Sequence, residues 1–183
     1  MIPPDPLAAY QNAPLSDLLA ILLRQFRRPL KGHGVELSDA EAEALAHDLA
    51  AHKPLSAKAQ AIRAALGDLV TESETVLARW NLTFQQSLDT EMKDIPGWES
   101  TAEFLEIANE KTNAELRIST GASLLVSLGV LRYAPDLLFL VERGEDDLDA
   151  VIARRVLLFA SEISPNDPHW LDQLRAWVAH SKL

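Results

Sequence analysis

The segment that most constrains the fold of this chain is 100–134, whose second half, Ile118–Leu131, contains no charged side chain. A run of that kind favours a helix that neighbouring elements cover on nearly every side. It is shorter than the roughly 20 apolar residues that cross a bilayer. The first half is charged and amphipathic, and helical spacing predicts its inward face to be Ala102, Leu105, Ala108, Thr112 and Leu116. We therefore predict one long central helix, buried in its second half.

Small side chains mark the buried half of this segment. Ser119, Ser123 and Ser127 follow one another at intervals of four residues, with Gly121 and Gly129 nearby. Small residues at helical spacing let a second helix approach closely, and a serine hydroxyl can donate a hydrogen bond to a carbonyl one turn earlier. The pattern predicts close packing between the central helix and another helix.

The composition favours helices over sheets. Only 7 of the 183 residues are glycine and 2 are tyrosine, and no alternating apolar and polar run is long enough to predict a sheet. Apolar residues make up 48% of the chain, which is sufficient for a hydrophobic core. The predicted fold class is all-α, a single-domain helical bundle of about seven helices around the central helix 100–134.

Capping residues and helix breakers place the other helices. Ser16 is the predicted N-cap of a first helix to about Arg28, which Pro29 would end. Ser38 and Glu41 have the spacing of a capping box. Further N-caps are predicted at Ser56, Asp146 or Asp147, and Asp167. The later helices are predicted over 39–51, 57–92, 136–142, 148–163 and 168–180.

The chain is predicted to consist of an arm and one domain. Residues 1–14 hold four prolines and predict an extended Pro-rich arm, because proline opposes helix and removes backbone donors. Residues 15–183 form the predicted all-α domain, with a possible subdivision near 94–99. The N-terminal residues lack the basic and apolar regions of a secretory signal, so we expect a cytoplasmic location without a membrane anchor.

Several kinds of chemistry have no signature in this sequence. There is no cysteine, which excludes thiolate nucleophiles and cysteine-ligated metals, and no glycine-rich nucleotide-binding loop. Glu103 and Glu106, with Glu110 one turn further, could share a hard cation through carboxylate oxygens. A metal-dependent all-α hydrolase is therefore one alternative function. A solvated acidic helix face accounts for the same residues, and we expect neither a metal nor another cofactor.

A basic segment at 24–34 suggests a second alternative. Arg24, Arg27, Arg28 and Lys31 carry four positive charges with no acidic residue between them. The predicted helix hairpin 38–66 follows, and Lys58 and Arg63 lie early on its second helix, where a DNA-recognition helix carries its contacts. A DNA-binding regulator is therefore possible in principle, but the net charge of −10 disfavours nucleic acid as a partner. Cations also suit the C-terminal end of a helix.

Two tryptophans on the last predicted helix indicate a contact surface. Trp170 and Trp177 share a face with Leu174 and Val178, and tryptophan is favoured at the centres of protein interfaces. Docking of this helix on the chain's own core would use the same face. Since caps and helix surfaces account for the polar residues, we expect a non-catalytic helical interaction or regulatory module. It would act through a protein partner or as a homodimer.

Overall fold

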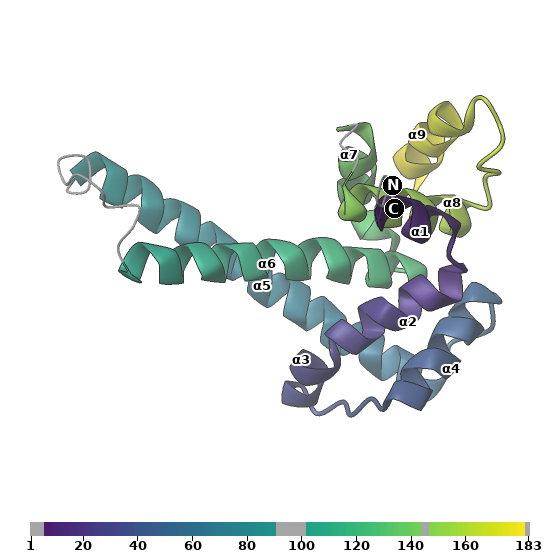
Figure 1. The fold of residues 1–183 in the computed structure, drawn as a ribbon, viewed down its shortest axis with the longest axis horizontal. Helices are drawn as coiled ribbons and strands as arrows, with labels where there is room; N and C mark the ends of the chain where they lie inside the picture. Colours follow the sequence, from purple (N-terminus) through teal and green to yellow (C-terminus); the bar gives the residue numbers. More distant parts are fainter. Residues whose placement is uncertain (1–5, 91–101, 144–146, 182–183) are drawn as a thin grey trace, which may run out of the picture.

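Helices account for most of the residues that the computed structural model describes, namely 6–90, 102–143 and 147–181. This described part contains no strand, which confirms the all-α prediction, and it has nine α-helices where about seven were predicted. Figure 1 shows their arrangement. The helices are α1 (Pro6–Asn12), α2 (Leu15–Gln25), α3 (Arg27–Gly32), α4 (Asp39–Ala50), α5 (Ala57–Thr90), α6 (Ala102–Ser127), α7 (Ala134–Glu142), α8 (Leu148–Ser161) and α9 (Trp170–His180).

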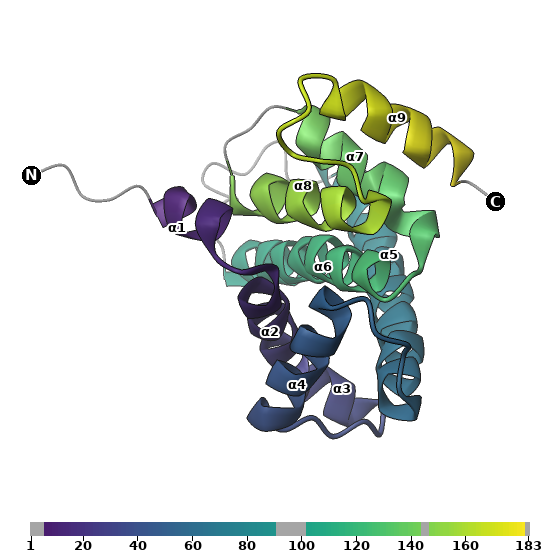
Figure 2. The same ribbon diagram turned by 90° about the vertical axis from the view of Figure 1, so that its right-hand side faces the viewer.

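The core lies where α5 and α6 meet the shorter helices. Figure 2 shows α7, α8 and α9 on one side of α6, and α2, α3 and α4 on the other. Most buried apolar residues of both groups belong to one hydrophobic cluster, to which α6 contributes Ala122, Leu124, Leu125 and Val126. α6 is therefore the central helix that the uncharged run predicts. No helix in the described ranges is both long enough and apolar enough to cross a membrane.

The central helix is continuous across the junction of its charged and uncharged halves, but it ends at Ser127 rather than near residue 134. Gly129 takes a left-handed φ of +84°. The Val130 N–H donates to the Leu125 carbonyl at 2.8 Å, and the Gly129 N–H donates to the Val126 carbonyl at 3.0 Å. This pair of bonds is the Schellman motif, which stops a helix at a glycine. A short 3-10 helix, Leu131–Tyr133, follows.

Close approach between α6 and α5 depends on Gly121. A Cβ added at Gly121 would lie 2.5 Å from Cγ2 of Val70 in α5. Ser123 is buried in the same stretch, and its carbonyl accepts a hydrogen bond of 2.9 Å from the Ser127 hydroxyl. The small-residue pattern therefore predicted this helix contact correctly.

The N-terminal prediction was wrong for residues 6–12, which form α1 instead of an extended arm. Pro6 is the first residue of that helix, a position whose N–H has no helical acceptor in any case. Ser16 is also not a cap, because α2 begins at Leu15 after Pro14 and Ser16 is buried. Prolines 3 and 4 lie outside the described residues.

The prediction that Pro29 ends a helix was wrong, because Pro29 lies within the first turn of α3. A proline is tolerated there because the first N–H groups of a helix have no partner. The first predicted helix is consequently two helices, α2 and α3, which meet at Phe26.

Three predicted N-caps are present. Ser38 accepts from the Glu41 N–H at 3.2 Å while the Glu41 carboxylate accepts from the Ser38 N–H at 2.8 Å, which completes the capping box of α4. Ser56 and Asp147 cap α5 and α8 by accepting from backbone N–H groups three residues later. The possible subdivision near 94–99 lies outside the described residues.

Candidate interaction surface

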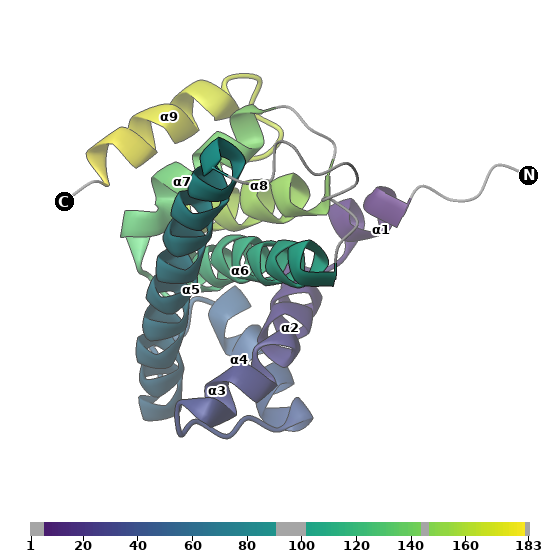
Figure 3. The ribbon, with the colours of Figure 1, turned by 90° about the vertical axis from the view of Figure 1, so that its left-hand side faces the viewer.

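The paired helices α5 and α6 project beyond the rest of the molecule, and we call this unit the α5–α6 hairpin (Figure 1). Figure 3 views the molecule from the projecting end. Among the described side chains, the last buried residue of α5 is Ser73 and the first buried residue of α6 is Ala114. Outward from these two positions, every described side chain of the hairpin is half-buried or exposed. The described side chains of the outer hairpin therefore include no buried residue.

A small aromatic contact holds the outer hairpin together. Trp80 and Phe84 of α5 stack with ring centroids 4.7 Å apart, and Lys111 of α6 places its Nζ 4.6 Å from the Trp80 ring centroid. The Trp80 indole N–H is buried and has no acceptor among the described residues. An open cavity of about 530 Å³ lies beside it, lined by residues that include Glu72 and Arg117. The two helices are thus loosely packed at this level.

The predicted inward face of α6 is only partly inward. Leu105 and Leu116 are each 52% exposed, Thr112 is exposed and Ala108 is half-buried. The side chain of Ala102 lies outside the described ones. The inward prediction was wrong for the two leucines: Leu105 lies on the outer hairpin, and Leu116, nearer the body, borders an open cavity beside Phe26 and Pro29.

Uncharged residues form a stripe along the solvent side of each hairpin helix, and we call each stripe a seam. The α6 seam consists of Leu105, Asn109, Thr112 and Leu116, and all four residues are exposed. The α5 seam consists of Thr71, Thr75, Ala78 and Leu82, which are also exposed, Leu82 to 60%. Both sets repeat at alternating intervals of three and four residues, the spacing with which helices pair in coiled coils.

The carboxylates considered for a metal site are on α6. Glu106 and Glu110 are exposed to solvent, and the side chain of Glu103 lies outside the described ones. Within the described ranges, no three histidine, aspartate or glutamate side chains are placed to hold one metal ion. The arrangement that the described residues show is that of a solvated acidic face.

The basic segment is paired largely with α4. Arg24 forms a salt bridge with Glu43, and Nη1 of Arg27 lies 2.8 Å from the Asp39 carboxylate. In the same region Lys31 lies 3.6 Å from Glu36 and Lys58 pairs with Glu41, whereas Arg28 and Arg63 have no ion pair among the described residues. Most of the basic side chains predicted to contact nucleic acid therefore form ion pairs with acidic residues on or next to α4.

The tryptophan-bearing face of α9 packs on the protein's own body. Leu174 is fully buried and Val178 is 3% exposed, so neither side chain can also contact a partner. Trp170 and Trp177 are half-buried against the core, and the Arg154 guanidinium lies 4.4 Å from the Trp170 ring centroid. The prediction of a contact surface is therefore wrong for Leu174 and Val178.

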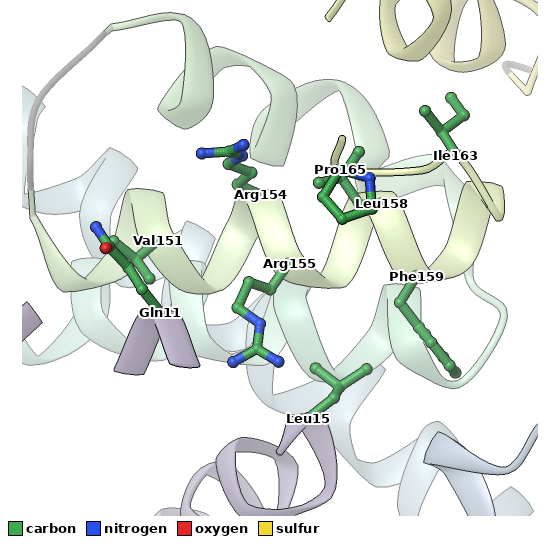
Figure 4. Close-up of a pocket in the computed structure, with 9 residues that line it drawn as sticks. All are labelled: Gln11, Leu15, Val151, Arg154, Arg155, Leu158, Phe159, Ile163 and Pro165. Atoms are coloured by element: carbon green, nitrogen blue, oxygen red, sulfur yellow. The ribbon is translucent and has the colours of Figure 1, made fainter. Parts of the chain in front are cut away.

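A groove runs along the outer face of α8, as Figure 4 shows. It encloses about 520 Å³ between α1, α8 and the segment that follows α8. Most of its lining is apolar, and Arg154 and Arg155 are its charged residues. Arg155 also holds α1 in place, because its Nη1 donates to the Tyr10 carbonyl at 2.8 Å and to the carbonyl of Ala13.

Helical spacing in the sequence indicates the two seams but does not specify whether they face the core or the solvent. Helical spacing places Leu105, Thr112 and Leu116 of the α6 seam on the predicted inward face, and Leu82 is the one large apolar residue of the α5 seam. Comparison of the chain with protein families, curated proteins and solved structures gave no match.

Proposed function

We propose that this protein is a non-catalytic interaction module that pairs with a second copy of itself through the α5–α6 hairpin. The observation that carries the proposal is the exposure of Leu82, Leu105 and Leu116, at 52–60%, on stripes with coiled-coil spacing. Removing such leucines from water on association stabilises the complex by about 25 cal/mol for each Å² of apolar surface buried.

A second copy is the partner that suits both helices at once. The α5 seam of one molecule packs against the α6 seam of the other, and twofold symmetry repeats this contact. Two hairpins then form a four-helix bundle, which buries the seam residues that are exposed in the single molecule. Asn109 in the α6 seam fixes the register, as a polar residue does at a coiled-coil position.

The proposal is tested by the mass of the protein in solution. Sedimentation equilibrium across the micromolar range should give a dimer for the wild-type chain. Leu82→Glu and Leu116→Glu place a charge in the seams and should weaken dimerisation at least tenfold, a loss of about 1.4 kcal/mol. Both positions are exposed in the monomer, so the helical circular dichroism should not change.

Phe139→Glu is the matched control, because Phe139 is 61% exposed but lies on α7, outside the hairpin. It should leave the dimer intact. A wild-type protein that remains monomeric at every concentration contradicts the proposal. A dimer that all three variants weaken equally contradicts the assigned surface.

A further inference from the structure

The α8 groove combines an apolar floor with two positive charges. Val151 and Leu158 lie on the same face of α8 one turn before and one turn after the arginine pair. In Figure 4, Arg154 extends to one side of α8 and Arg155 to the other. Phe159, Ile163 and Pro165 continue the lining at the far end, and none of the described residues that line the groove is acidic.

The two arginines have no carboxylate partner among the described residues, although the protein is strongly acidic: the Arg154 guanidinium lies over the Trp170 ring, and Arg155 donates to the Tyr10 and Ala13 carbonyls. Neither Arg154 nor Arg155 forms a salt bridge among the described residues, while the chain has 27 acidic and 17 basic residues. Arg155 is half-buried, and burial lowers the pKa of its guanidinium, because a cation loses solvation without gaining a carboxylate. An anion would satisfy N–H groups of these side chains through charge-assisted hydrogen bonds.

We infer that the groove binds a single-chain carboxylic acid, whose carboxylate accepts hydrogen bonds from Arg154 while its hydrocarbon chain lies along the apolar floor. A volume of about 520 Å³ is within the range of small-molecule sites, which are mostly apolar with a few placed polar groups. One recess of this size favours a small amphipathic anion over a folded partner, which needs a far larger surface.

Titration calorimetry with decanoate tests the inference on the full chain. Decanol, with a chain of the same length and no charge, is the comparison ligand. Decanoate should bind at least tenfold more tightly than decanol. Arg154→Gln should remove most of that difference, because it deletes the charged donor of the hydrogen bonds to the carboxylate. Val151→Glu should abolish decanoate binding by placing a like charge on the floor.

The controls separate this site from other surfaces. Arg154 and Val151 make no contact with the carbonyls that Arg155 holds, so their variants leave α1 in place. Arg28→Gln removes an arginine that also has no ion pair among the described residues but lies on α3, and it should not change the affinity. Leu82→Glu should not change it either, which keeps this result independent of dimerisation.

Equal affinity for decanoate and decanol overturns the inference, as does an affinity that Arg154→Gln leaves unchanged. Loss of binding in Leu82→Glu would place the ligand on the hairpin seam and also overturn it. An apolar peptide that binds through its terminal carboxylate more tightly than decanoate would assign the groove to a protein partner instead.

Discussion

Gly121 of α6 and Val70 of α5 are packed so closely that a single added methyl group has no space. A Cβ at Gly121 would approach Cγ2 of Val70 to 2.5 Å and Cζ of Phe26 to 3.5 Å. Val70 is branched at its Cβ and fully buried, so it cannot move aside without repacking the core.

Gly121→Ala should therefore lower the free energy of unfolding by about 1–3 kcal/mol, the usual cost of overpacking a core. Gly67→Ala is the matched control, since Gly67 lies inside α5 with no atom within 4 Å of an added Cβ. It should stabilise the protein by about 0.5–1 kcal/mol, because alanine is the better helix former. Urea denaturation measures both values, and an equal gain from both substitutions would show that α5 and α6 are not in close contact at Gly121.

A substitution at Gly129 tests where the central helix ends. Its φ of +84° is a left-handed conformation that costs an alanine about 1 kcal/mol or more. Gly129→Ala should destabilise the protein by about that amount although an added Cβ would meet no neighbour. Thermal denaturation measures this loss of stability. A stabilising effect would mean that the helix continues towards residue 134, as the sequence alone predicts.

Glu41 should give the fold an acid-sensitive contact. A hydrogen bond from Lys58, then those from Ser38, lower the pKa of Glu41 from 4.5 to about 2. Because the pKa is lower in the folded protein, the ionised carboxylate stabilises the fold above pH 4.5, and this contribution is lost as the pH falls towards 2.

Glu41→Gln should thus flatten the pH dependence of stability between about pH 4.5 and 2, the window set by linkage. Denaturation curves at a series of pH values measure this slope. Glu74→Gln is the control, since Glu74 is an exposed glutamate of α5 without a hydrogen bond or ion pair among the described residues. If the two variants change the slope equally, the contact with Lys58 does not form in solution.

A substitution at Leu174 tests whether α9 stabilises the fold or binds a partner. It is fully buried where α9 meets the body of the protein. Leu174→Ala should cost about 2–5 kcal/mol, as deletion of a buried leucine side chain does. Phe139→Ala, at an exposed position on α7, should change stability by less than about 0.5 kcal/mol. A small effect of Leu174→Ala would indicate that α9 is detached and that its apolar face is open to a partner.

The sequence determined the local structure of this protein to a large extent. The capping box at Ser38 and Glu41 and the caps at Ser56 and Asp147 formed as predicted, because each involves residues three apart along the chain. α5 also extends through Gly67 as one long helix, as its spacing predicted. The errors at Pro6 and Pro29 have a local cause as well, since proline opposes a helix only beyond the first turn.

Only the tertiary structure decided which apolar faces are covered. Leu105 and Leu116 on α6, and Leu174 and Val178 on α9, have the same helical spacing, yet the first pair is half-exposed and the second is buried. Helical periodicity defines a face but does not specify whether another element reaches it. Leu105 lies on the outer hairpin and Leu116 borders an open cavity beside Phe26 and Pro29, while α9 folds back onto α7 and α8. This difference moved the candidate interaction surface from the tryptophan helix to the α5–α6 hairpin.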